Sequence, residues 1–243
     1  MDEKDLALAA RVHYSFLPDY YNSEFIDIAV LAQPLSKIGG DYCSILPLNE
    51  NRLVVGMCDV TGHNIASALF AARINTFVVT QALRYQSPCQ LISLLNEFLC
   101  QRLAGSFILN SFCSIIFDFA KGTMDFASAA HPPVIHFQRH KMTTDLLSSE
   151  TTLLGIQHPL LVACRTEKIQ LQPGDRIVLY TDGLTEIRNE AGDFFGVKGL
   201  QTFTANHSEL ESDAFNRQLL ATALNYGNGN ATDDILLMTM TIR

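Results

Sequence analysis

The segment R176-I-V-L-Y-T-D-G-L-T-E186 joins a short apolar strand to an acidic residue, and it guides the interpretation of the whole chain. Four apolar residues, from Ile177 to Tyr180, predict a buried strand that ends close to Asp182 and Gly183. An Asp-Gly pair at a strand end is typical of a turn, yet a carboxylate there is also a suitable ligand for a hard metal ion. The choice between a turn and a metal site depends on the other strand ends.

Acidic residues also lie at or beside the ends of other predicted strands. Residues 52–58 lead into Asp59, two glycines precede Asp41 in G39-G-D41, and Asp233 lies at the start of the last strand. Strand ends are rigid, so carboxylates held there converge with little entropic loss, and Mg²⁺ and Mn²⁺ prefer such oxygen ligands. Each acid taken singly also fits a turn or a solvated strand start, and spacing alone does not show that they meet.

The composition indicates an acidic, globular protein. The 243 residues are 48% hydrophobic and 17% charged, which is enough for a substantial core in one large domain or two small ones. With 17 Lys and Arg against 25 Asp and Glu, the formal net charge is -8. This balance argues against sequence-independent nucleic-acid binding and against a membrane-surface partner, because both depend on basic residues.

The cysteines and the N-terminal residues predict a reduced, cytoplasmic protein. No C-x-x-C pair occurs, which argues against zinc, and most cysteines lie in apolar runs, so we expect buried reduced thiols. The first residues are too charged for a signal-peptide core, and no apolar run approaches the ~20 residues of a membrane span. The six cysteines are Cys43, Cys58, Cys89, Cys100, Cys113 and Cys164.

The strand pattern predicts an α+β fold of two packed antiparallel β-sheets flanked by helices, an αββα sandwich. Apolar and alternating runs mark about ten strands, too many for one flat sheet. Three pairs of runs flank short turns and are expected to form hairpins: 111–119 with 123–129, 134–137 with 142–146, and 162–171 with 175–181. The other strands are expected at 25–32, 44–48, 52–58 and 234–242.

Helical periodicity occurs at 4–16, 65–83, 87–103 and 211–226. The second segment is apolar on most sides, so we expect it to pack on a sheet, and the third begins with Ser87 as N-cap before Pro88. The first is only half-amphipathic. We interpret it as the end of a longer helix from an upstream domain, or as a helix that binds a partner.

Several sequence blocks together resemble a known family. In chain order they are G39-G-D41, D59-V-T-G-H63, F126-A-S-A-A-H131, L171-Q-P-G-D-R-I-V-L-Y-T-D-G-L-T-E186 and T232-D-D-I-L-L237. They resemble the bacterial SpoIIE-type branch of the metal-dependent protein phosphatase 2C superfamily, from about residue 20 to the end. The resemblance implies an N-terminal linker or regulatory helix at 1–20 and a phosphatase domain at 21–243, with a Mn²⁺ or Mg²⁺ two-metal centre at one end of the sheets.

The resemblance also assigns roles to individual residues. Asp59 looks like the carboxylate that bridges both metals, and the backbone carbonyl of Val60 adds a ligand. Asp182 and Asp233 look like ligands of the first metal, and Asp41 like a ligand of the second. A water activated by the two metals then attacks the phosphate in line, and no covalent phospho-enzyme is needed.

The chain departs from the family pattern at three positions. Ser44 stands where an acid is usual, which is expected to weaken the second metal. Asn64 and Ala130 stand where glycine is usual; asparagine tolerates a left-handed backbone, so we expect the turn at Asn64 to survive. We interpret His131 as a packed structural histidine, and His63 as a cap after the turn rather than a proton donor.

The resulting hypothesis is a serine/threonine phosphatase that acts on a STAS-type anti-sigma-factor antagonist in a partner-switching pathway. The N-terminal helix would connect it to a receiver or sensor domain, and the protein would be regulated by dimerisation. One alternative is a degenerate phosphatase that serves as a regulatory binding module, supported by the three departures. Another is a hydrolase of small phosphoesters, although no phosphate-cradling P-loop occurs in the sequence.

Overall fold

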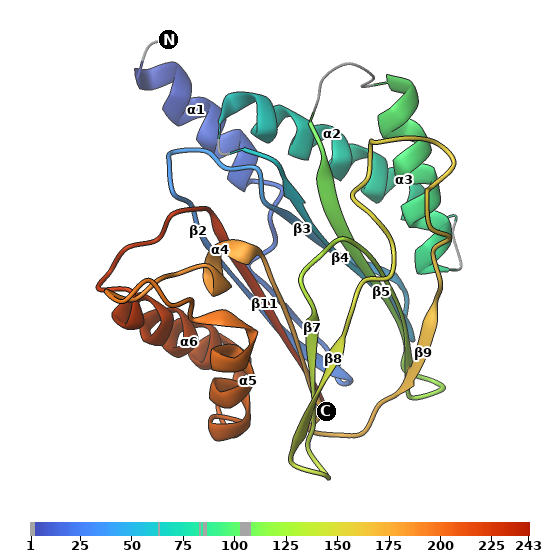
Figure 1. Ribbon diagram of the computed structural model, residues 1–243. Helices are drawn as coiled ribbons and strands as arrows, with labels where there is room; N and C mark the ends of the chain where they lie inside the picture. The colour runs from blue at the N-terminus through green and yellow to red at the C-terminus, as the bar shows by residue number, and fades with distance from the viewer. Residues whose placement is uncertain (1–2, 63, 83, 85–86, 103–107) are drawn as a thin grey trace. The chain divides into compact units, whose positions relative to one another are not determined.

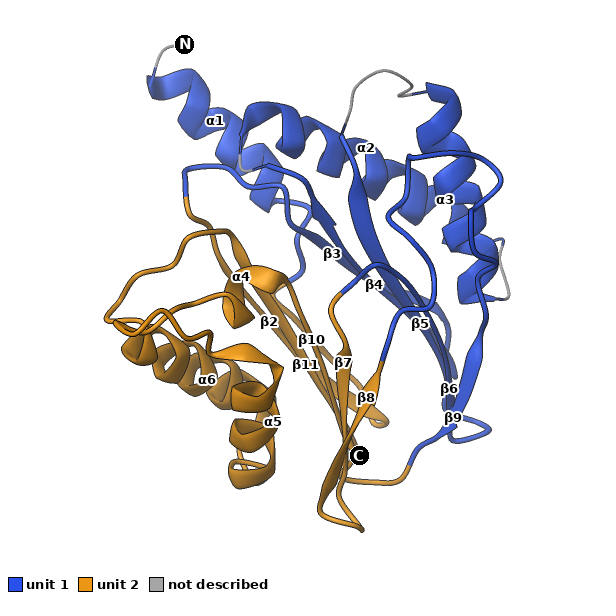
Figure 2. Cartoon of the chain, in the orientation of Figure 1, with its two compact units in different colours: residues 1–18, 36–131, 148–171 blue, residues 19–35, 132–147, 172–243 orange. Residues whose placement is uncertain are grey.

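The computed structural model describes residues 3–62, 64–82, 84, 87–102 and 108–243. The chain folds as two compact units, each built on one antiparallel sheet (Figures 1 and 2). Unit 1 contains residues 1–18, 36–131 and 148–171, and unit 2 contains residues 19–35, 132–147 and 172–243. Both units are therefore assembled from segments that are far apart in the sequence.

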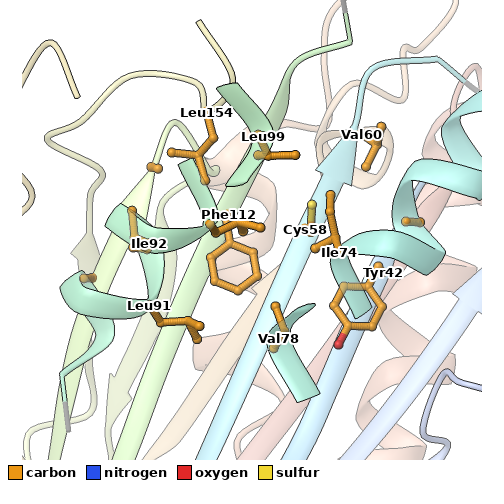
Figure 3. Packing of buried hydrophobic residues seen from close by; sticks show 14 residues of the cluster. Tyr42, Cys58, Val60, Ile74, Val78, Leu91, Ile92, Leu99, Phe112 and Leu154 are labelled. Atoms are coloured by element: carbon orange, nitrogen blue, oxygen red, sulfur yellow. The ribbon is translucent and has the colours of Figure 1, made fainter. Parts of the chain in front are cut away.

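Unit 1 contains a five-stranded sheet in the order β3-β4-β5-β6-β9. Helices α2 and α3 cover one face of this sheet and form its core with large side chains such as Phe112 and Ile74 (Figure 3). The strands are β3 (Tyr42–Asn49), β4 (Arg52–Val60), β5 (Asn110–Asp118), β6 (Thr123–Ala129) and β9 (Glu167–Gln170). The helices are α1 (Glu3–Tyr14), α2 (Ile65–Ala82) and α3 (Pro88–Arg102).

Helix α2 packs on the sheet, as its composition predicts. By length and composition alone it is apolar enough to cross a membrane. Its fully buried positions nevertheless recur every three or four residues, which is how a helix covers a sheet with one face. These positions are Ser67, Ala68, Ala71, Ile74, Val78 and Ala82.

Unit 2 contains a six-stranded sheet in the order β1-β2-β11-β10-β7-β8. Helix α6 packs on β2 and β11, and α5 packs on β7 and β8. The strands are β1 (Tyr20–Asn22), β2 (Ile26–Gln33), β7 (Val134–Gln138), β8 (Thr143–Leu147), β10 (Arg176–Tyr180) and β11 (Ile235–Ile242). The helices are α4 (Asp182–Thr185), α5 (Gly196–Asn206) and α6 (Ser212–Tyr226).

The predicted fold class, α+β with two antiparallel sheets flanked by helices, is confirmed, but one predicted hairpin is wrong. Strand β9 pairs with β6, whereas β10 pairs with β11 and β7, so the turn at 172–174 joins two different sheets. The ion pair between Lys168 and Asp125, 3.3 Å apart, supports the β6–β9 pairing. Residues 162–166 form no strand, and helix α5 was not predicted at all.

The prediction of reduced cysteines is wrong for one pair. Cys89 and Cys164 form a disulfide, with their Cα atoms 5.5 Å apart. The two residues are 75 positions apart, and only the fold brings the start of α3 beside the segment that precedes β9. The other four cysteines are free, and of these Cys100 is partly exposed while the rest are buried.

Candidate functional site

Asp41 and Asp59 lie at the same end of one strand pair in unit 1. Tyr42 pairs with Cys58 in the antiparallel register of β3 and β4, so the residue before Tyr42 and the residue after Cys58 are opposite each other. Burial raises the pKa of the Cys58 thiol far above its usual value, and the charges of Asp59 and Asp41 both add to this rise. Both carboxylates therefore contribute to the electrostatic environment of this buried thiol.

Gly40 explains how the loop before Asp41 reaches this strand end. A Cβ atom at Gly40 would lie 2.6 Å from the carbonyl oxygen of Val60 and 2.9 Å from that of Gly62. Such distances are too short for any side chain, so only glycine allows the loop to pack directly on the end of β4. The loop thus brings Asp41 to the backbone segment that carries Asp59 and Val60.

Ser44 lies on the other face of the sheet from Asp59. It pairs with Gly56, two residues along the strand from Tyr42, so its side chain is on the same face as Tyr42. That face packs against α2 and α3, as Figure 3 shows for Tyr42. Asp59 follows Cys58 on the opposite face. The register therefore gives no reason for the serine at 44 to weaken a metal held by Asp41 and Asp59.

Asn64 is a helix cap rather than a left-handed turn residue. Its Oδ1 accepts hydrogen bonds from the backbone N–H groups of Ala66, at 2.8 Å, and Ser67, at 3.2 Å. The hydroxyl of Ser67 donates in return to the carbonyl of Asn64, at 2.6 Å. Asn64 does not have a positive φ, so the turn here does not require the left-handed backbone that asparagine tolerates. The substitution supplies the N-cap of α2.

Ala130 occupies a conformation that favours glycine. Its φ is 51°, in the left-handed region, and its backbone N–H donates to the hydroxyl of Ser149 at 2.7 Å. The following residue, His131, is only 3% exposed, which favours the packed structural role over a catalytic one. The role predicted for His63 lies outside the described residues.

In unit 2, Asp182 and Asp233 also lie at the same end of a strand pair. Strands β10 and β11 are antiparallel, with Tyr180 opposite Leu237. The chain therefore leaves β10 toward Asp182 at the same end of the pair at which it enters β11 after Asp233. A Cβ atom at Gly183 would lie only 2.1 Å from the carbonyl oxygen of Asp234. The backbone beside Asp182 is thus in direct contact with the backbone that follows Asp233.

The two consecutive aspartates at the start of β11 have different environments. Asp234 is 5% exposed, and its Oδ1 accepts a hydrogen bond from the backbone of Leu35 at 2.8 Å. Asp233 is exposed, and its Oδ1 accepts a bond from the backbone N–H of Asp234 at 2.8 Å. The structure therefore gives a physical reason to regard Asp233 as the candidate ligand and Asp234 as an anchor.

The donors at these strand ends fit a hard divalent cation. They are carboxylate and carbonyl oxygens, which suit Mg²⁺ and Mn²⁺ and do not suit metals that select thiolates. Among the described residues, no group of three or more His, Cys, Asp or Glu side chains is placed to hold a metal. Unit 1 offers Asp41 and Asp59, unit 2 offers Asp182 and Asp233, and their action on shared metals remains a prediction.

Comparisons with known sequences point to phosphatases. The sequence model of the family Stage II sporulation protein E (SpoIIE) matches residues 49–243. The chain is 24% identical to the phosphoserine phosphatase RsbU of Bacillus subtilis (strain 168) over 239 residues, covering 98% of this chain and 70% of RsbU. It is also 24% identical to the phosphoserine phosphatase RsbP of the same organism, over 76% of this chain but only 46% of RsbP.

Solved structures have the same fold. The SiaA-PP2C domain of Pseudomonas aeruginosa matches with a TM-score of 0.85 at 17% identity, over 99% of this chain and 96% of that domain. RsbX, solved in complex with magnesium, matches with a TM-score of 0.68 at 14% identity, over 92% of this chain and 98% of RsbX. At these identities the likeness establishes the fold of a protein phosphatase 2C domain.

Proposed function

This chain belongs to the family of Stage II sporulation protein E (SpoIIE), and on that premise we propose that it is a Mn²⁺- or Mg²⁺-dependent phosphatase of phosphoserine or phosphothreonine in a regulatory protein. The relatives RsbU and RsbP are phosphoserine phosphatases, which supports the reaction class. The observation that carries the proposal is the presence of two strand ends that each offer two aspartates beside a glycine without room for a side chain.

The proposed roles are those that the family resemblance implies, and the positions of the side chains at strand ends support them. Asp59, Asp41 and the carbonyl of Val60 would hold metal ions from the β3–β4 end, and Asp182 and Asp233 from the β10–β11 end. When bound, two such cations lower the pKa of a water and neutralise the phosphate oxygens. The protein's own contribution is rigidity, since strand ends and close glycine contacts keep the carboxylates oriented before the substrate arrives.

The proposed substrate is a STAS-type anti-sigma-factor antagonist in a partner-switching pathway, as the family resemblance implies. Helix α1 would connect the domain to a receiver or sensor domain and take part in a homodimer. Leu8 and Val12, one turn apart on α1, are 61% and 60% exposed, which leaves an apolar face available for such contacts. The proposed location is the cytoplasm, where thiol-based reducing systems would act on the Cys89–Cys164 disulfide.

The alternative of a binding module without turnover has lost much of its physical support. Ser44 lies on the opposite face of the sheet from Asp59, and Asn64 serves as the N-cap of α2. Only Ala130 remains a strained departure, and its left-handed backbone affects stability more directly than it affects a carboxylate. An active enzyme is therefore the better proposal.

Hydrolysis of p-nitrophenyl phosphate against added Mn²⁺ tests the proposal. Asp182→Asn keeps the shape of the side chain but removes the charge that a divalent cation requires, so we expect turnover to fall by on the order of 100-fold. Asp213→Asn is the matched control, because Asp213 is exposed on α6 and bonds Arg217 on the same helix. It should leave turnover unchanged.

Other outcomes would contradict the proposal. Turnover that persists in chelator and in Asp182→Asn would mean that the aspartates hold no catalytic metal. A wild-type protein without turnover at any Mn²⁺ concentration, on p-nitrophenyl phosphate or on a phosphoserine peptide, would favour the binding module.

A further inference from the structure

The chain leaves strand β10 and starts helix α4 within a single residue, Thr181. Its backbone is still extended, with φ -88° and ψ 160°, and its carbonyl already accepts the first helical hydrogen bond, from Leu184 N–H at 3.2 Å. Asp182 is the first residue of this helix. The carbonyl of Thr181 is therefore turned toward α4, although its neighbour strand β11 still offers a backbone donor.

The hydroxyl oxygen of Thr181 replaces its carbonyl oxygen as the hydrogen-bond acceptor for β11. The N–H of Thr181 donates to the carbonyl of Leu236 at 3.0 Å, as in a regular antiparallel pair. The N–H of Leu236 donates to Oγ1 of Thr181 at 2.9 Å instead of to a backbone carbonyl. Thr181 is completely buried, so no water is available to replace this oxygen.

The residues on both sides of Asp182 contact the same carbonyl group. Oγ1 of Thr181 lies 3.5 Å from the carbonyl oxygen of Asp234, at the long limit of a hydrogen bond. Gly183 approaches that same oxygen so closely that no Cβ would fit. The contacts of Thr181 and Gly183, the two chain neighbours of Asp182, thus fix Asp182 to the backbone that carries Asp233.

We propose that Thr181 is a positioning residue, whose hydroxyl sets the spacing of the Asp182 and Asp233 carboxylates and so the affinity for a divalent cation. The inference rests on the proposed function, and it extends that function to a residue with no direct role as a ligand. Groups that orient metal ligands influence affinity strongly even though they never contact the metal. A hydroxyl on Cβ is required here, and either serine or threonine supplies it.

Calorimetric titration of the metal-free protein with Mn²⁺ tests this role. Thr181→Val keeps the shape but removes the oxygen, and we expect its dissociation constant for Mn²⁺ to rise about tenfold. Thr181→Ser retains the hydroxyl and should restore nearly wild-type affinity. Thr239→Val is the matched control: Thr239 is also completely buried, in β11, and its hydroxyl donates to Oδ1 of Asn216 at 2.6 Å, a contact that involves none of the candidate ligands.

Hydrogen exchange of the Leu236 amide in metal-free protein provides a second readout. Thr181→Val should lose protection at this amide, and Thr181→Ser should keep it. Wild-type Mn²⁺ affinity in Thr181→Val would overturn the positioning role but leave the proposed function standing. An equal loss of affinity in Thr239→Val would do the same, because it would indicate general destabilisation. A wild-type protein that binds no Mn²⁺ would contradict the proposed function, and the positioning role would fall with it.

Discussion

Asp182 follows a buried strand closely, and this position makes it a candidate ligand in the sequence itself. The face on which Ser44 lies is not visible, since it depends on the pairing of β3 with β4. The cap that Asn64 forms is also not visible in the sequence, because asparagine suits both a left-handed turn and an N-cap.

Ala130 gives a prediction about stability at the scale of one residue. Ala130→Gly removes a side chain from a left-handed backbone and should increase the free energy of unfolding by about 1 kcal/mol, after the greater flexibility of glycine in the unfolded chain is subtracted. Urea denaturation would measure the change. Ala127→Gly, in the strand β6 that ends just before Ala130, is the control and should be destabilising, because Ala127 is buried and does not have a positive φ. An Ala130→Gly protein no more stable than wild type would contradict the account.

At the scale of elements, the specific P-G-D motif has a structural role that the sequence did not reveal. Asp175 is 1% exposed and joins the turn before β10 to the end of β7. Its carboxylate accepts hydrogen bonds from His136 Nε2 at 3.2 Å, from Gln172 N–H at 3.0 Å and from Arg139 N–H at 3.0 Å. The side chain therefore fixes the geometry of the connection after β7 and the connection before β10, at one end of this strand pair.

This network predicts a dependence of stability on pH. Burial by itself would raise the pKa of Asp175, but the bonds from His136, Gln172 and Arg139 outweigh it and hold the pKa below its usual value. A carboxylate with a lowered pKa in the folded state stabilises the protein above the unfolded-state pKa, so this contribution should be lost as pH falls below about 4. Urea unfolding from pH 6 to pH 3 would measure it. Asp175→Asn should be less stable at pH 6 and show a smaller decline below pH 4; an unchanged decline would contradict the assignment.

The Cys89–Cys164 disulfide predicts a second property of the elements in unit 1. It connects the start of α3 to the segment before β9 across a sequence separation of 75 residues, and in the chain-entropy view a closed loop of this size contributes about 4 kcal/mol. Dithiothreitol should therefore lower the melting temperature of the wild type. It should have no further effect on a Cys89→Ser, Cys164→Ser double variant, and Cys100→Ser on the same helix should melt like wild type. Six free thiols in protein denatured without reductant would contradict the pairing.

At the scale of the whole molecule, local patterns predicted most elements but not all of their partners. The strands predicted at 123–129 and 134–137 correspond to β6 and β7, because alternation and turn residues are local signals. The partners of β9 and β10 were not found, since a short turn looks the same whether it closes a hairpin or links two sheets. The disulfide was missed for the same reason, because its two cysteines meet only after folding.

The candidate site was predictable only in part. The aspartates stand at strand ends in the sequence, and the fold brings them together in pairs, Asp41 with Asp59 in unit 1 and Asp182 with Asp233 in unit 2. The supporting contacts of Gly40, Gly183 and Thr181 depend on backbone atoms of distant segments. Such contacts have no local sequence signal, although the glycines adjacent to Asp41 and Asp182 are visible in the sequence.

The most direct test of the central claim is the anomalous scattering of crystals grown with Mn²⁺. We expect manganese peaks with Asp41 and Asp59 as ligands at the β3–β4 end and with Asp182 and Asp233 as ligands at the β10–β11 end. Asp233→Asn crystals should lose or weaken the peak assigned to the first metal. Manganese peaks bound only to other side chains, or none near these aspartates at millimolar Mn²⁺, would contradict the claim that this chain is a two-metal phosphatase.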